Sequence, residues 1–242
     1  LGVSLVLKRY SMIGDGLSHV SFGALSVAVA FGWAPLAVSI PVVAAAAVLL
    51  LRITGNGKIK SDAAIAMISA GSLAVGIIVT SLTTGMTTDV SSYMFGSILA
   101  MSREDVVLSA VLSLIVLGMF ILCYNKVFAV TFDESFARAT GVRVSGYNTI
   151  LAVLTAVTIV LGMRMMGAML ISSLIIFPAL TSMRVFKSFS GVILSAGTVS
   201  VVCFFIGLVL SYVYSIPAGA SVVVVNMGAF GIFSVIQAVR RR

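Results

Sequence analysis

Two side chains near the start of the chain have the types and the spacing of metal ligands. Asp15 and His19, the single histidine, lie in Gly14-Asp15-Gly16-Leu17-Ser18-His19, and residues four apart share one face of a helix. A carboxylate and an imidazole so placed can ligate zinc, manganese or iron. Alternatively the pair is structural: Asp15 caps a helix and pairs with His19 or with Lys8–Arg9. The pair alone is incomplete as a structural zinc site, which takes about four ligands, but an incomplete site lets a transported ion leave.

The second candidate is the polar segment at residues 125–147, the longest in the chain. Within it Thr131-Phe132-Asp133-Glu134 fits a capping box, in which Thr131 and Glu134 bond to free backbone amides. Gly141 then ends a short helix in a left-handed cap. This helix is either an ordinary surface element or a contact for another protein. Its side chains include Phe132, Asp133, Glu134, Phe136 and Arg138.

The composition assigns both candidates to a membrane protein. Of the 242 residues 60% are hydrophobic and 9% are charged, and the mean hydropathy is +1.22. A soluble domain carries about 25% charged residues, and disordered chains have the opposite bias. Both classes are therefore excluded. The net charge of +8 does not indicate nucleic acid here, because the basic residues fall between apolar runs.

Charge-free runs predict an all-α transmembrane bundle of eight complete spans, preceded by a truncated first helix that ends before Lys8. A span needs about 20 apolar residues. We expect 16–51 to contain two spans divided at Gly32–Pro35, and 188–239 to contain two divided at Ser215–Gly219. The runs 63–88, 106–125, 144–163 and 165–183 supply the other four. Residues 90–102 are too short for a span and favour an interfacial or re-entrant helix.

Threading these spans alternately through a bilayer separates the basic residues sharply. Thirteen of the 15 Lys and Arg residues fall on one side, and only Arg103 and Arg164 fall on the other. Cytoplasmic loops carry the excess of positive charge. The C-terminus is therefore predicted to be cytoplasmic, the missing N-terminus is expected outside, and Asp15 and His19 fall in the cytoplasmic half of the second span.

No motif for nucleotide hydrolysis is present in the sequence. Gly55-Asn56-Gly57-Lys58 lacks the spacing and the following Ser or Thr of a phosphate-binding loop. Energy for transport must then come from a partner or a gradient. A gradient-driven carrier should have internal repeats and several buried carboxylates, and neither is found. An intramembrane enzyme using Ser18 and His19 is disfavoured, because adjacent helical residues point about 100° apart.

Four blocks, in order, make the chain resemble the membrane permease of the metal-type ABC importers, which carry zinc, manganese or iron. The first is Gly14–His19, quoted above, and the second is Tyr93-Met94-Phe95-Gly96-Ser97-Ile98-Leu99-Ala100. The third is Phe132-Asp133-Glu134-Ser135-Phe136-Ala137-Arg138-Ala139-Thr140-Gly141-Val142. The fourth is Gly167-Ala168-Met169-Leu170-Ile171-Ser172-Ser173-Leu174-Ile175-Ile176-Phe177-Pro178-Ala179. Together they cover essentially the whole chain.

The resemblance implies one permease domain, residues 1–242, in a homodimer in the cytoplasmic membrane. Two ATP-binding subunits would lie below it, and an extracellular solute-binding protein would deliver the ion. It makes Asp15 and His19 the metal ligands and residues 132–142 the helix that couples the permease to the ATPase. No permanently bound cofactor is expected, only the transported ion, with zinc favoured on resemblance alone. A permease for a siderophore or cobalamin remains the alternative, although such a cargo gains nothing from an Asp–His pair.

Overall fold

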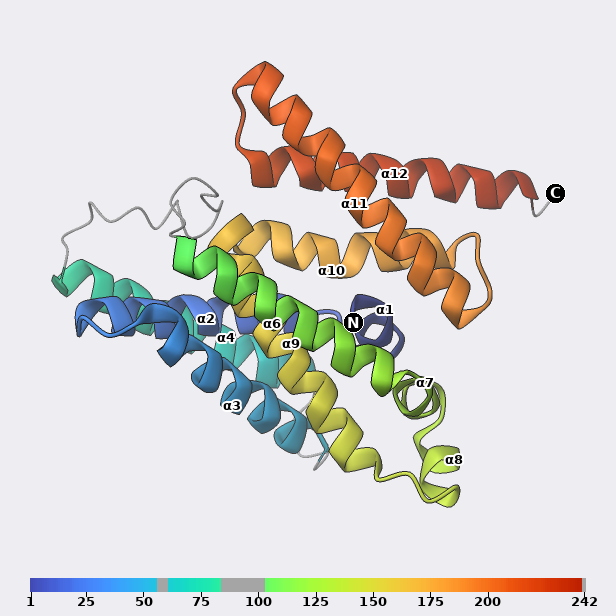
Figure 1. Ribbon diagram of the computed structural model, residues 1–242, viewed down its shortest axis with the longest axis horizontal. Coiled ribbons are helices and arrows are strands. Elements are labelled where there is room, and N and C mark those ends of the chain that lie inside the picture. Colours follow the sequence, from blue (N-terminus) through green and yellow to red (C-terminus); the bar gives the residue numbers. More distant parts are fainter. Residues whose placement is uncertain (56–60, 84–102, 241–242) are drawn as a thin grey trace.

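The fold is described by a computed structural model that covers residues 1–55, 61–83 and 103–240, and every regular element in these ranges is a helix (Figure 1). The expected helix at 90–102 and the motif at 93–100 lie outside the described residues. The helices are α1 (Gly2–Leu7), α2 (Ile13–Ala30), α3 (Pro35–Gly55), α4 (Ser61–Thr83), α6 (Arg103–Leu122), α7 (Tyr124–Phe132), α8 (Glu134–Ala139), α9 (Val144–Met166), α10 (Ala168–Met183), α11 (Phe189–Tyr214) and α12 (Ala218–Arg240).

The count of eight complete spans is not confirmed. Among the described residues six helices are long and apolar enough to cross a membrane: α2, α3, α4, α9, α11 and α12. A seventh span is counted if Val106–Leu122 of α6 and α7 are taken together, although the two are bent by 68°. The remaining predicted span, α10, has 16 residues and a length of about 24 Å, shorter than a hydrocarbon core of about 30 Å.

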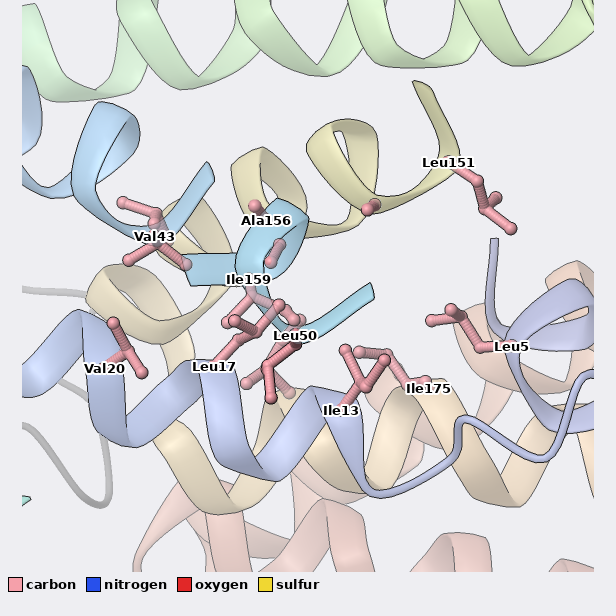
Figure 2. Close-up of a cluster of buried hydrophobic side chains, with 14 of the residues drawn as sticks. Leu5, Ile13, Leu17, Val20, Val43, Leu50, Leu151, Ala156, Ile159 and Ile175 are labelled. Atoms are coloured by element: carbon pink, nitrogen blue, oxygen red, sulfur yellow. The ribbon is translucent and has the colours of Figure 1, made fainter. Parts of the chain in front are cut away.

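Helix α2 lies at the centre of the first half of the chain and packs against α3, α4, α9 and α10. Leu17, Val43 and Ile159, from α2, α3 and α9, are fully buried where these three helices meet (Figure 2). The close contact with α4 is possible because Gly23 has no side chain. A Cβ at this position would lie 2.6 Å from the backbone oxygen of Ser72. Small residues let membrane helices approach closely without any hydrophobic drive between them.

Helices α11 and α12 form a hairpin that packs against α10, shown in orange and red in Figure 1. The two helices touch at Gly207, where an added Cβ would lie 2.6 Å from the Cα of Val222. The Ser221 hydroxyl donates to the Gly207 carbonyl at 2.7 Å. Many large apolar side chains of this hairpin remain exposed, among them Leu194, Phe205 and Ile232. Its outer surface therefore suits lipid or another apolar protein face.

Candidate functional site

The predicted pair of Asp15 and His19 is brought together at the beginning of α2. Asp15 lies in the first turn of that helix, where the helix dipole favours a negative charge. Its Oδ2 lies 3.7 Å from Nε2 of His19, with the two side chains 48% and 22% exposed, respectively. Both groups are thus partly open on one face, and the described residues contain no group of three or more metal-ligating side chains.

The structural alternative for Asp15 holds only in part. Met12 stands at the N-cap of α2, and no side chain in the described part of the chain caps that helix, so the predicted capping role of Asp15 is wrong. The pairing with His19 is present, but Lys8 bonds to Glu134 instead of to Asp15. The Asp15 carboxylate is therefore not neutralised by Lys8, and a bound cation can interact with it.

Ser172 of α10 is a polar neighbour of Asp15 that the sequence analysis did not single out. Its hydroxyl lies 3.5 Å from Asp15 Oδ1 and 3.1 Å from the carbonyl oxygen of Ala168. The available signal was the Ser172-Ser173 pair within an otherwise apolar run. The fourth motif thereby meets the first motif in space.

A cavity of about 870 Å³ opens beside Asp15. Charged side chains at its wall are Asp15, Arg9 and Asp62, and α4 contributes further wall residues that include Ser69. Asp62 was also missed, although it is the last charge before the apolar run that begins at Ala63. Of the pair, Asp15 lines this cavity and His19 does not.

Ser18 is not arranged to act as a nucleophile. Its side chain is fully buried, and its hydroxyl donates to the carbonyl oxygen of Gly14 at 2.8 Å. A hydroxyl directed at the preceding turn is a common way to satisfy a serine inside a helix. The Ser18–His19 arrangement that the enzyme alternative requires is therefore absent.

The short helix expected in the polar segment exists, but a different residue caps it. Helix α8 begins at Glu134, and Asp133 Oδ1 accepts hydrogen bonds from the backbone amides of Ser135 and Phe136, both at 2.9 Å. Thr131 lies inside α7, and its buried hydroxyl has no hydrogen-bond partner among the described residues. The predicted capping box is therefore wrong, because α7 continues through Phe132 and leaves Asp133 in the extended conformation that an N-cap needs.

The predicted end of this helix at Gly141 is confirmed. Gly141 has φ +82°, and its amide donates to the carbonyl oxygen of Arg138 at 3.1 Å while that of Val142 donates to Ala137 at 3.0 Å. These two bonds form a Schellman motif. Ala137 is fully buried against Val130 and Val144, so α8 is fixed to the end of α7 and the start of α9.

The aromatic side chains of this segment face outward. Phe132 is 58% exposed and Phe136 is 64% exposed. Phe132 also contacts the rings of Phe128 and Phe189, with centroid distances of 4.9 and 5.7 Å. Arg138 is exposed on the same short helix. The segment therefore presents an aromatic and charged surface on a well-anchored element, and such a surface can dock a protein partner.

The fold and these side chains define a multi-pass helical membrane protein with a carboxylate–imidazole pair, of which the carboxylate lines a cavity. The family model described as "ABC 3 transport family" matches residues 1–237. The chain therefore belongs to the ABC 3 transport family.

Two relatives and one solved structure show what the chain is similar to. The "High-affinity zinc uptake system membrane protein ZnuB" of Haemophilus influenzae is 27% identical, with 95% of this chain and 88% of that protein covered. The "Manganese import system permease protein ScaB" of Streptococcus gordonii is 29% identical, with 93% and 81% covered. The structure of "PsaBC from Streptococcus pneumoniae in complex with Fab" matches with a TM-score of 0.85 at 29% identity, covering 96% of this chain and 83% of that one. The relatives support a metal-transport permease and include both a zinc and a manganese system.

Proposed function

We propose that the chain moves a divalent transition-metal ion, zinc or manganese, across the cytoplasmic membrane, and that Asp15 and His19 bind the ion on its way. The observation that carries this proposal is the pair itself, with 3.7 Å between Asp15 Oδ2 and His19 Nε2. Carboxylate oxygen suits manganese, and imidazole nitrogen suits zinc. The weak preference of the sequence analysis for zinc gains no support from this ligand set, which serves both metals.

A second copy of the chain completes the site in this proposal. One chain offers two ligands, fewer than the four or more that a bound transition metal takes. A twofold axis beside α2 would add a second Asp15 and a second His19, because a symmetric dimer presents the same residues from both copies. The partial exposure of both side chains leaves room for such a pairing.

Helix α8 is the proposed contact with a separate ATP-binding subunit, which would supply the energy that the chain has no motif to generate. The exposed Phe132 and Phe136, the Asp133 cap and the exposed Arg138 support this role. The chain would then be one transmembrane domain, residues 1–242, in which 125–147 is the coupling loop. The excess of basic residues on one side favours a cytoplasmic position for α8 and the C-terminus, and a solute-binding protein would deliver the metal from outside.

Uptake by the reconstituted complex tests the cargo directly. Proteoliposomes that contain the permease, its ATP-binding subunit and its solute-binding protein are given radiolabelled zinc, manganese or iron, one ion at a time. We expect ATP-dependent uptake of zinc or manganese. Uptake of a siderophore or cobalamin without free metal would contradict the proposal and favour the organic-cargo permease. Metal uptake that needs a gradient but no ATP would favour the carrier.

The coupling role of α8 is tested by removing its cap. Asp133→Ala leaves the amides of Ser135 and Phe136 without their acceptor, and a lost N-cap costs about 0.5–2 kcal/mol. We expect the Ala variant to capture less of the ATP-binding subunit in a pull-down and to stimulate its hydrolysis less. Asp133→Asn is the matched control, because asparagine caps about as well as aspartate. Equal capture by the Ala variant and the wild type would show that α8 is not the coupling element.

A further inference from the structure

The Lys8 side chain joins three segments that are distant in sequence. Its Nζ donates to Glu134 Oε1 and to Asn148 Oδ1, both at 2.6 Å. Asn148 Nδ2 donates to the same Glu134 oxygen at 3.0 Å. Lys8 lies between α1 and α2, Glu134 is the first residue of α8, and Asn148 belongs to α9. These three side chains, called the Lys8 link below, form a closed polar triangle.

The two charges of the Lys8 link are unequally exposed. The Lys8 side chain is 6% exposed, whereas that of Glu134 is 47% exposed. Removing an ammonium from water is costly unless it is paired and hydrogen-bonded. The Lys8 ammonium therefore needs its partner to offset the cost of burial, whereas the Glu134 carboxylate can be solvated by water. If α8 moved away from α1, the Lys8 charge would be left buried and unpaired, so the two segments are held together.

Glu134 is ionised in this arrangement. Burial would raise the pKa of its carboxyl, but hydrogen bonds from Lys8 and Asn148 and the charges of Lys8 and Arg138 lower it, and the pKa lies below its usual value. The link is thus a charged one at neutral pH.

The segment between α1 and α2 is a tight turn that can pass a movement on. Arg9 adopts φ +60°, and its amide donates to the carbonyl oxygen of Val6 at 3.1 Å while that of Tyr10 donates to Leu5 at 2.8 Å. These bonds close a Schellman motif around Lys8. Helix α2 begins at Ile13, and Asp15 lies in its first turn. A shift of Lys8 therefore reaches Asp15 through a few residues of hydrogen-bonded chain.

We propose that the Lys8 link transmits displacement of α8 to the first turn of α2 and so makes Lys8 a positioning residue for the Asp15–His19 pair. The inference rests on the proposed function, in which α8 contacts the ATP-binding subunit and α2 carries the metal ligands. When that subunit moves α8, the pairing with Glu134 carries the turn at Lys8 along, and the carboxylate of Asp15 changes its position relative to the cavity. Lys8 thereby couples hydrolysis to the release of metal without touching the metal or the ATP-binding subunit.

The variant Lys8→Met, tested in the complete reconstituted complex, distinguishes a loss of coupling between ATP hydrolysis and metal uptake from a failure of the subunits to assemble. Methionine keeps the apolar stem, and the half-exposed Glu134 is left facing water, so the variant is expected to fold. ATP hydrolysis and metal uptake are measured in the same proteoliposomes. We expect the ATP-binding subunit to remain bound and ATP to be hydrolysed, while the metal taken up per ATP falls by at least about fivefold, the lower end of usual coupling between sites. Lys8→Arg should restore the ratio, because its guanidinium can donate to both oxygen atoms.

Lys187→Met is the matched control. Lys187 is exposed, lies on the same predicted side of the membrane and makes no ion pair with the part of the chain that the structure describes. This variant should keep the wild-type ratio of metal to ATP. A wild-type ratio in Lys8→Met would overturn the Lys8 link alone, whereas a wild-type complex that takes up no metal would overturn the proposed function as well.

Asn148→Ala keeps the inference testable if Lys8→Met fails to assemble. This variant removes one corner of the triangle and leaves the Lys8–Glu134 pair, so we expect it to assemble with a smaller fall in metal per ATP. An assembled Asn148→Ala complex with the wild-type ratio would overturn the proposal. A failure of Lys8→Arg to restore the ratio would also overturn it, since a charged link must accept the other cationic side chain.

Discussion

The helix that carries the Asp15–His19 pair and the hairpin near the C-terminus differ both in how apolar they are and in how far protein encloses them. In the apolar 18-residue stretch of α2, 72% of the residues are buried inside the chain. The corresponding share is 17% in α11 and 11% in α12. Mean hydropathy runs the other way, at 1.3 for α2 against 2.5 and 2.0 for α11 and α12. The less apolar helix is thus the one shielded by protein.

This difference follows from what each helix must hold. A charged side chain in a membrane segment is costly and turns toward the protein interior or a polar cavity. Helix α2 contains Asp15 and His19 and is surrounded by α3, α4, α9 and α10. Helices α11 and α12 have no charge before Arg240 and can face lipid or a second copy. Enclosure, more than hydropathy, marks the functional helix.

The largest effect on stability is expected when the same substitution, glycine to alanine, is made once in α2 and once in α12. Gly23→Ala would place a Cβ 2.6 Å from the Ser72 backbone oxygen, whereas a Cβ at Gly228 of α12 meets no atom of the described residues within 4 Å. Overpacking costs about 1–3 kcal/mol, while alanine in an open helix gains about 1 kcal/mol over glycine. We expect the thermal midpoint of the detergent-purified permease to fall for Gly23→Ala and to stay equal or rise for Gly228→Ala.

Two outcomes would change this account of how α2 and α12 are packed. Equal midpoints for the two variants would mean that α2 and α4 do not approach as closely as described. A Gly228→Ala chain that is stable yet does not form the proposed dimer on size-exclusion chromatography would assign α12 to the contact between copies and not to lipid.

An intermediate effect is expected at Gly141, where the cost is conformational and not steric. Within the ranges that the structure describes, an added Cβ would meet no atom within 4 Å, but the residue has φ +82°. A left-handed conformation costs other residues about 1–2 kcal/mol, and a β-branched side chain resists it most. Gly141→Val should therefore weaken binding of the ATP-binding subunit in a pull-down, and Gly141→Asn should do so less. Identical binding by both variants would argue against a role for this helix end.

The smallest effect is expected at the turn between α11 and α12. Ser215 is exposed and has φ +53°. Ser215→Gly relieves the left-handed strain but gives the unfolded chain more freedom. The two effects oppose each other, so we expect the free energy of unfolding to change by less than about 1 kcal/mol and uptake to be unchanged. A loss of uptake would mean that this turn takes part in transport.

Helix boundaries were the part of the fold that local sequence could predict. The break expected at Gly32–Pro35 is present: Gly32 has φ +67°, the rings of Phe31 and Trp33 stack at 5.0 Å, and α3 begins at Pro35. Glycine conformation and the missing proline N–H act within a few residues. The same local reasoning predicted the turn at Ser215 and the cap at Gly141.

Features that depend on distant residues were not predictable in this way. Lys8 and Glu134 are 126 positions apart, and no periodicity indicates that they pair. The choice of Asp133 over Thr131 as the cap of α8 depends on how far α7 extends, which the packing of Val130 against Ala137 and Val144 determines. In the candidate site the sequence predicted the Asp15–His19 pair, but Ser172 and Asp62 required the fold to bring α10 and α4 beside α2.

The most direct test of the account is metal uptake by a His19→Ala complex, with Ser18→Ala as its neighbouring control. His19 supplies the single imidazole of each chain, whereas the Ser18 hydroxyl only bonds to Gly14 within its own helix. In proteoliposomes that contain the ATP-binding subunit and the solute-binding protein, we expect His19→Ala to assemble normally yet take up no zinc or manganese, as Asp15→Asn should also do. Ser18→Ala should transport as the wild type does. Wild-type uptake by His19→Ala would contradict the account and leave His19 as a packing residue of α2.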